Sequence, residues 1–377
     1  NITLTASSPL TVLAGAPVVD NDGGAITLTA TNDGGDDDHL TISANVTATG
    51  GNGSIDLNAG TDLVIDTDAV VSTVGTGGIT GDAERTLIVQ SDAATTTVRS
   101  ADGDITFNAN QGVTPTTGDF YGINLEGSLV ETTNGAISLT GQGGDNSGGS
   151  PSDDNDGILV EGATIRSTGT GTITLVGTAT DGSDSDGVDM DSDSGGTAAT
   201  ITSVAGAIAI TGNSTGTETG VEIQSGSVVT STGTGPSAAT ITIAGTGDEY
   251  AVYIGNSGSA VTSVDGDIIV TGLAQATGDA TGIWIEDGAT VSSTGTAGDS
   301  ASITLDGRSA RYGTYIENAG TTITSVAGDI DIIGTGTTVD GVSLLSGAQV
   351  TADSGDITIT GDSTDNNGVE IGDPGTA

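Results

Sequence analysis

Carboxylates gather in one recurring turn of this 377-residue chain, directly before a short stretch that reads small-apolar-x-apolar. If such turns stack, their like charges lie about 5 Å apart, and a hard, oxygen-seeking cation offsets the repulsion. The turns therefore predict a calcium site. Its candidate ligands are Asp153, Asp154, Asp156, Asp184, Asp186, Asp189 and Asp191. The alternative is a solvated acidic surface that keeps a long molecule soluble.

Aromatic residues make up only 2% of the chain, yet five of the eight lie between positions 250 and 315. Tyr253, Trp284 and Tyr315 are spaced by 31 and 31 residues, at the same outward position of three consecutive stretches. Tyr250 and Tyr312 precede two of them by three residues. An exposed aromatic strip is typical of sugar-binding or protein-contact surfaces, and these five residues are the candidate partner-binding site. The alternative is cross-strand packing that only stabilises a sheet.

The composition excludes several kinds of partner. The net charge is −45, with 50 acidic residues against five Arg and no Lys, so the chain lacks the cations that nucleic acids and anionic membranes require. Without Cys, neither disulfides nor thiolate metal sites can form. No apolar run approaches the roughly 18 to 20 residues of a membrane helix, so we expect no membrane insertion.

The elements that position these side chains repeat along the chain. The small-apolar-x-apolar stretches begin at Gly122, Gly157, Gly187, Gly220, Ala251, Gly282, Gly313, Gly341 and Gly368. Intervals of 27 to 35 residues indicate a repeat architecture in which each repeat packs on its neighbours.

Each repeat contains three short, β-branched, alternating segments bounded by Gly, Ser, Asp or Asn. The clearest ladder is Ile2, Ile26, Ile55, Ile79, Ile105, Ile137, Ile173, Ile208, Ile241, Ile268, Ile303, Ile330 and Ile357. A second is Val130, Ile165, Ile201, Val229, Val261, Val291, Ile323 and Val350. They predict an all-β fold, a right-handed parallel β-helix with three strands in each coil of about 30 residues and about 12–13 coils. An array of β-sandwich domains is the alternative, but those repeats run near 100 residues and bury aromatic residues.

We expect one solenoid over residues 1–377. Residues 110–377 form regular coils, whereas residues 1–109 form less regular ones, either shorter or two-stranded, because the ladder intervals there fall to between 24 and 29 residues.

Catalysis has to be weighed because some parallel β-helices cleave polysaccharides. Glycoside hydrolysis needs two carboxylates at a set separation, and carboxylates abound here. However, one His and five Arg leave little to hold an acidic substrate, and the repeats are uniform. We therefore expect a protein that is not an enzyme. A deep cleft with convergent carboxylates would favour the opposite reading.

Three runs carry a family resemblance: ITSVAGDIDIIGTG (323–336), VTSTGTG (229–235) and GVEIQSGSVVTSTG (220–233). They resemble the repeats of large bacterial exoproteins, the filamentous-haemagglutinin-like and autotransporter-like adhesins, over roughly residues 122–377. The resemblance implies secretion, a right-handed β-helical shaft, and attachment or matrix building at the cell surface. It predicts an extracellular structural or adhesive fibre, and a carbohydrate-binding surface protein using the aromatic strip is the alternative.

The two ends of the chain suggest a further partner. Joined end to end they read GVEIGDPGTANITLTA, which resembles a shortened coil with a first and a third strand. An uncapped solenoid end is an exposed strand edge. The sequence therefore predicts head-to-tail association with itself, as consecutive segments of one longer chain or as subunits of a filament.

Overall fold

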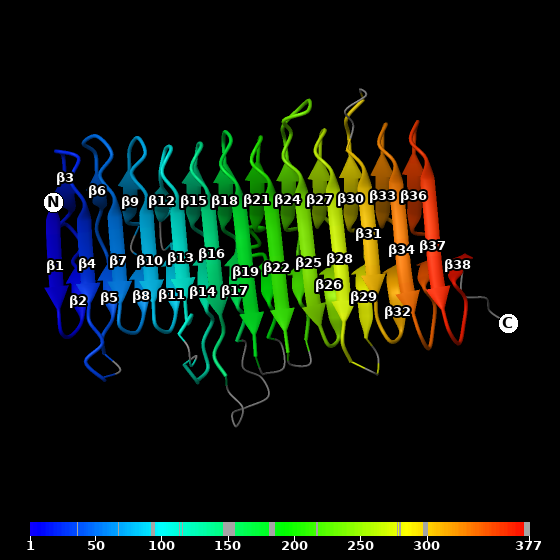
Figure 1. Ribbon diagram of the computed structural model, residues 1–377, viewed down its shortest axis with the longest axis horizontal. Coiled ribbons are helices and arrows are strands. Elements are labelled where there is room, and N and C mark those ends of the chain that lie inside the picture. Colours follow the sequence, from blue (N-terminus) through cyan, green and yellow to red (C-terminus); the bar gives the residue numbers. More distant parts are fainter. Residues whose placement is uncertain are drawn as a thin grey trace.

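The computed structural model describes residues 1–372 except positions 36, 67, 92–94, 113, 115, 146–154, 181–184, 216–217, 277, 279 and 297–300. The described residues form strands, turns and bends, without helices, and the strands lie in three parallel sheets of 13, 13 and 12 strands (Figure 1). Each of the first twelve coils contributes one strand to each sheet, and the thirteenth contributes strands to two of them. The predicted three-stranded parallel β-helix is confirmed.

Sheet A carries the isoleucine ladder. Its strands are β1 (Ile2–Ala6), β4 (Ile26–Ala30), β7 (Ile55–Ala59), β10 (Ile79–Ala83), β13 (Ile105–Ala109), β16 (Ile137–Gln142), β19 (Ile173–Ala179), β22 (Ile208–Ser214), β25 (Ile241–Gly247), β28 (Ile268–Ala274), β31 (Ile303–Arg308), β34 (Ile330–Gly336) and β37 (Ile357–Ser363). Every strand begins with the isoleucine of the predicted ladder, and all thirteen are register partners of their neighbours.

Sheet B follows sheet A along each coil and carries both candidate sites. Its strands are β2 (Leu10–Val12), β5 (Leu40–Ile42), β8 (Leu63–Ile65), β11 (Leu87–Gln90), β14 (Ile123–Glu126), β17 (Ile158–Glu161), β20 (Val188–Asp191), β23 (Val221–Ile223), β26 (Tyr250–Ile254), β29 (Thr281–Ile285), β32 (Tyr312–Ile316), β35 (Val342–Leu345) and β38 (Val369–Gly372).

Sheet C completes the coil. Its strands are β3 (Val18–Asp20), β6 (Val46–Ala48), β9 (Val70–Thr73), β12 (Thr97–Arg99), β15 (Leu129–Thr132), β18 (Thr164–Ser167), β21 (Thr200–Ser203), β24 (Val228–Ser231), β27 (Ala260–Ser263), β30 (Thr290–Ser293), β33 (Thr322–Ser325) and β36 (Gln349–Ala352). The second predicted ladder, from Val130 to Val350, is in register throughout this sheet.

The winding of the coils is right-handed. In Figure 1 the coils advance from left to right, the near strands of sheet A point downward, and the strands of sheet C behind them point upward. A chain that descends in front and rises behind while it advances to the right traces a right-handed helix. This is the hand expected for crossovers between parallel strands.

The coils of residues 1–109 also have three strands each, so their interpretation as two-stranded is wrong. Their strands in sheet A span five residues, whereas the sheet A strands from β16 onward span six or seven. Strand length changes along the chain, but the number of strands per coil does not.

The core is a narrow column because successive strand residues point to opposite faces. In β25, Ile241 and Ile243 are fully buried while Thr242 and Ala244 face outward. The same alternation repeats in neighbouring coils, so each buried aliphatic side chain packs on those directly above and below it. This stacking holds the register that aligns the outward rows.

A glycine ladder, which the sequence analysis did not identify, lies where the longer strands of sheet A approach the start of sheet B. A Cβ built on Gly245 would lie 1.7 Å from the carbonyl oxygen of Ala251, and one on Gly212 would lie 1.8 Å from that of Gly220. No side chain fits at such a distance. The two sheets therefore meet backbone to backbone at this corner, beside the first residues of β23 and β26.

Turn aspartates before sheet A connect consecutive coils. The backbone N–H groups of Ala136, Ser302 and Asp356 donate to the Oδ1 atoms of Asp104, Asp267 and Asp329 at 2.8, 2.9 and 2.8 Å. Each acceptor belongs to the preceding coil. These carboxylates therefore satisfy backbone donors in the turns, a role that Asp adopts readily. No described helix is long and apolar enough to cross a membrane.

Candidate functional site: an aromatic groove beside an acidic groove

The described members of both candidate sets lie in the strands of sheet B or in the turns directly before them. Tyr253, Trp284 and Tyr315 are successive register partners in β26, β29 and β32. In the same row, Glu222 of β23 lies between Asp189 of β20 and Tyr253. A single outward strand position thus presents carboxylates in two coils and aromatic rings in the next three.

The five aromatic rings form one contiguous cluster. Trp284 meets Tyr250, Tyr253 and Tyr315 with ring centroids 4.7, 5.8 and 5.7 Å apart and interplanar angles of 68°, 82° and 62°. Tyr312 stacks on Tyr315 at 4.5 Å. Edge-to-face contacts of this kind are favourable for aromatic quadrupoles. The rings therefore stabilise one another, as the packing interpretation expected, while all five remain partly exposed.

Four of these rings, all except Tyr253, border a groove of about 330 Å³, which we call the aromatic groove. Its lining residues are Glu249, Tyr250, Thr281, Trp284, Arg311, Tyr312, Tyr315 and Glu317. Ligand pockets in proteins span roughly 300–1,000 Å³, so this volume suits a small molecule or one unit of a polymer.

Tyrosine hydroxyls in the cluster pair with glutamates. Tyr253 donates to Glu286 Oε1 at 3.0 Å, and Tyr315 donates to Glu317 Oε2 at 2.9 Å. Burial, and then the adjacent carboxylates, raise the pKa of both phenols, so they stay protonated donors. Burial, and then Glu249, likewise raise the pKa of Tyr250.

The indole Nε1 of Trp284 is buried and has no hydrogen-bond acceptor among the described residues. An unsatisfied buried donor of this kind costs about 1–3 kcal/mol. The contacts with the surrounding rings therefore hold Trp284 in place although its Nε1 donor is left unsatisfied.

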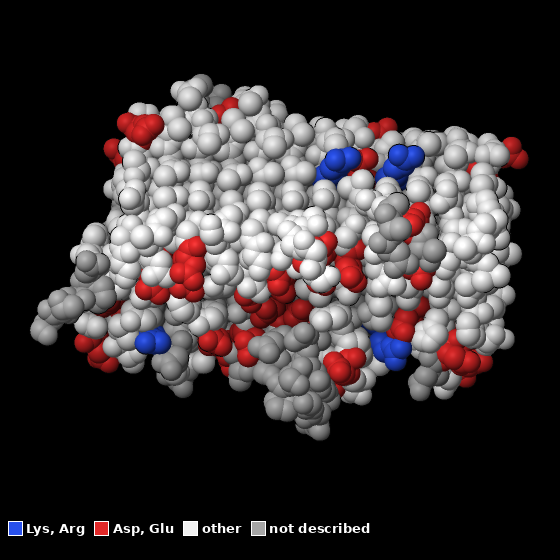
Figure 2. Space-filling view, turned by 180° about the vertical axis from the view of Figure 1, so that it is seen from behind, with Lys and Arg blue, Asp and Glu red and all other residues white. Residues whose placement is uncertain are grey.

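A second groove, of about 440 Å³, lies toward the N-terminal side of the same face, and we call it the acidic groove. Its lining residues are Tyr121, Asp156, Leu159, Glu161, Asp186, Asp189, Asp191, Glu218, Glu222 and Gln224. Figure 2 shows acidic side chains gathered near the middle of this face.

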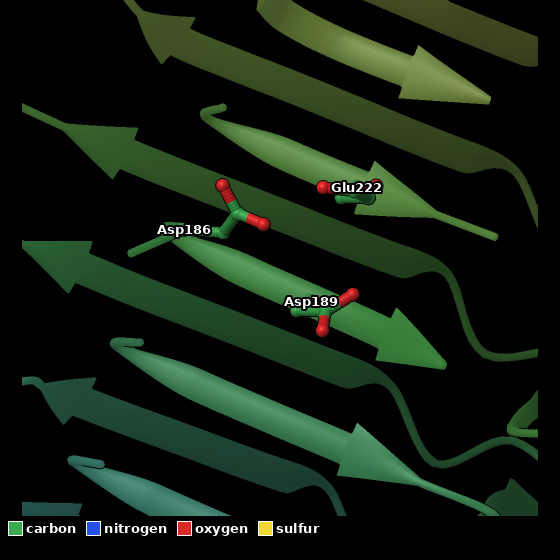
Figure 3. A group of neighbouring side chains, drawn as sticks. All are labelled: Asp186, Asp189 and Glu222. Atoms are coloured by element: carbon green, nitrogen blue, oxygen red, sulfur yellow. The ribbon is translucent and has the colours of Figure 1, made fainter. Parts of the chain in front are cut away.

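Asp186, Asp189 and Glu222 converge within the acidic groove (Figure 3). One carboxylate oxygen from each lies within 4.8 Å of those of the other two. Burial, and then the carboxylates of Asp186, Asp189 and Asp156, raise the pKa of Glu222 from its ordinary 4.5 to about 11. Glu222 therefore holds a proton at neutral pH, which relieves the repulsion between the three groups.

This trio fits the chemistry of calcium. Calcium binds oxygen ligands at 2.3–2.6 Å, so two ligands of one ion lie at most about 5 Å apart. The 4.8 Å spacing of the trio meets that limit. A bound cation would replace the proton of Glu222 because both neutralise the same negative charge.

The predicted calcium ligands are only partly brought together. Asp186 and Asp189 belong to the trio, and Asp156 lines the same groove. Asp191 also lines it but pairs with Glu161 in the strand register. Asp153, Asp154 and Asp184 lie outside the described residues.

The sequence-based prediction missed Glu222. The alignment of Val188 with Val221 places Glu222 beside Asp189 and could have identified it.

The interpretation of the turn aspartates before sheet B as a solvated surface is wrong for three of them. Asp156, Asp186 and Asp340 are buried. Their Oδ1 atoms accept backbone N–H groups of the following coil, from Asp186 at 2.7 Å, Thr219 at 2.9 Å and Asn367 at 3.2 Å. These carboxylates link coils to one another, because a buried acceptor must be satisfied within the protein.

The fold defines this protein as a parallel β-helix of the β-solenoid class, with two adjacent grooves on one sheet. No protein-family model, curated protein sequence or solved structure matches this chain.

Proposed function

We propose that this protein is a rigid, acidic shaft, secreted or displayed at the cell surface, with a structural or adhesive role. The observation that supports it most strongly is the unbroken register of two sheets through thirteen successive coils and of the third through twelve. A column of stacked hydrogen-bonded strands resists bending, and its strong negative charge opposes lateral clumping. An extracellular location belongs to the same proposal.

The shaft continues head to tail in this proposal. Val342 of β35 is 1% exposed, whereas its register partner Val369 in the last coil is 37% exposed. Leu4 in the first coil is likewise exposed, while its partner Leu28 is buried. Inward positions at both ends thus lack the cover that every internal coil receives. A further coil of the same kind, stacked in register, would supply it.

Negative-stain electron microscopy across a concentration series tests the association, with Val369→Asp as the variant. Val204→Asp is the matched control, because Val204 is 38% exposed but lies in a turn midway along the rod. We expect longer rods at higher concentration for the native chain and the control, and single rods for Val369→Asp. Single rods of the native chain at every concentration would contradict association between subunits.

A binding role for the acidic groove is favoured over a catalytic one. Its carboxylates converge, but its described lining contains no Arg or His to hold an acidic polysaccharide. Incubation with polysaccharides and measurement of newly formed reducing ends tests this choice. Release of reducing ends that disappears in Asp189→Asn would establish catalysis instead.

Carbohydrate binding at the aromatic groove is the second candidate function. It is favoured by five partly exposed rings that are concentrated in three coils, and four of these rings line one groove. Aromatic faces are common contacts for sugars and for protein partners. On a glycan array we expect binding that is lost in Trp284→Ala and retained in Phe120→Ala, which removes a partly exposed ring outside the groove.

A further inference from the structure

The rings of the aromatic groove form walls instead of a flat platform. Trp284 is inclined by 68° to Tyr250 and by 62° to Tyr315, so neighbouring coils present ring faces in different directions. A flat sugar ring stacks best on one broad plane. A compact group surrounded by several ring faces suits this concave arrangement better.

The charges around the groove favour a positive occupant. Two carboxylates, Glu249 and Glu317, line it against a single guanidinium, Arg311. Glu286 lies next to the same cluster, where it accepts the Tyr253 hydroxyl at 3.0 Å. Tyrosines that donate to carboxylates have more electron-rich rings, which strengthens their attraction for cations.

The protein itself supplies one cation to these rings. The guanidinium carbon of Arg311 lies 4.9 Å from the centroid of Tyr312. This distance is within the roughly 6 Å range of a cation–π interaction. The contact uses one wall of the groove, and Tyr250, Trp284 and Tyr315 line the remainder.

We propose that the aromatic groove binds an organic ammonium group, held by the rings and by the Glu249 and Glu317 carboxylates. Quaternary ammonium ions are recognised by such aromatic cages, and a protonated amine adds hydrogen bonds to carboxylates. This inference rests on the proposed carbohydrate function only where the ammonium belongs to a glycan, as in an amino sugar. The positively charged nitrogen is common to both sources of the ligand, a free organic ammonium ion and an amino sugar of a glycan.

The single tryptophan of the chain reports on this groove directly. Trp284 fluorescence is followed while the native protein is titrated with choline and, separately, with 3,3-dimethylbutan-1-ol, its neutral isostere. We expect a saturable change with choline at a Kd at least tenfold below that of the alcohol. Equal affinities, or no saturable change with choline, would overturn the proposal.

Charge variants that retain Trp284 sharpen the test. Arg311→Gln removes the competing internal cation and should tighten choline binding several-fold, while Glu317→Gln should weaken it several-fold. Arg308→Gln is the matched control, because Arg308 lies outside the groove and pairs with Asp306 at 2.9 Å. Weaker binding in Arg311→Gln would contradict the proposed competition. Calorimetry on Trp284→Ala should show binding about tenfold weaker or lost.

A glycan comparison separates this inference from the carbohydrate function. Glucosamine oligomers carry protonated amines, and N-acetylglucosamine oligomers of the same length do not. Preference for the glucosamine oligomers supports both proposals. Equal binding that depends on Trp284 retains the carbohydrate function but overturns the ammonium site. If choline binds but neither oligomer does, the ammonium site is retained and the carbohydrate function is rejected.

Discussion

Glu222 and Tyr253 are direct register partners in sheet B, so Glu222, which lines the acidic groove, lies beside the aromatic cluster that contains Tyr253. After burial and the nearby Glu286, the carboxylate of Glu222 also contributes to the raised pKa of Tyr253. The two grooves therefore lie in neighbouring coils of sheet B, and Glu222 acts electrostatically on a tyrosine of the aromatic cluster. A long cationic ligand could contact both without leaving the outer face of sheet B.

The raised pKa of Glu222 predicts a pH dependence of stability. The folded chain keeps a proton that the unfolded chain loses above pH 4.5, so the free energy of unfolding falls as pH rises from 4.5 toward about 11. The slope from this group is at most about 1.4 kcal/mol per pH unit. Glu222→Gln cannot lose the proton and should remove that slope. Urea unfolding between pH 5 and 9, with a chelator present, measures it.

The control for this experiment is Glu84→Gln, which alters an exposed glutamate outside both grooves. Its profile should follow that of the native chain. Identical slopes for Glu222→Gln and the native chain would show that Glu222 titrates in the folded protein as it does in the unfolded one.

Calcium should stabilise the native chain through the trio. At a concentration one hundred times its Kd, a ligand that binds only the folded state adds about 2.7 kcal/mol. Because the ion displaces the Glu222 proton, we expect the gain to be larger at pH 8 than at pH 6. Thermal unfolding with calcium or with EDTA measures it. Asp189→Asn should lose the gain, and the exposed-site control Asp353→Asn should keep it. A Tm that calcium leaves unchanged would contradict calcium binding at this site.

Adjacent isoleucines of β28 test the stacked core. Ile268 is fully buried in the ladder, whereas Ile269 is 36% exposed on the outer face. Ile268→Ala should lower the free energy of unfolding by about 2–5 kcal/mol, because it leaves a cavity between coils. Ile269→Ala should change it by less than about 0.5 kcal/mol. Chemical denaturation compares the two, and similar losses would argue against a stacked column.

The glycine ladder can be tested with a single methyl group. Gly245→Ala places a Cβ against the Ala251 carbonyl, so the corner between β25 and β26 must open. We expect a strong loss of stability and disruption of the nearby aromatic groove, visible as a shift in Trp284 fluorescence. Gly278→Ala is the control, since a Cβ there has no neighbour within 4 Å. A native-like spectrum and Tm for Gly245→Ala would mean that the corner tolerates separation.

The repeating pattern of inward aliphatics was sufficient to predict the fold and the aromatic row. Coil-to-coil pairing of Ile208, Ile241 and Ile268 follows from their spacing, because a one-residue slip would turn every aliphatic side chain outward. Once that register holds, Tyr253, Trp284 and Tyr315 must align. Similarly, Glu222 could have been placed beside Asp189 from the same ladder.

Local spacing in the sequence thus determined the coil, its register and the rows of side chains on its faces, since strand alternation and stacking depend only on neighbouring repeats. Only the tertiary structure determined the contacts at the corners where sheet A turns into sheet B. It buries Asp156 and Asp186 against backbone donors of the next coil and brings Gly245 against Ala251. The lengths and paths of the turns set those distances, and the repeat spacing of the sequence does not predict them. For that reason the convergence of Asp186 with Asp189 and Glu222 became visible only in the folded chain.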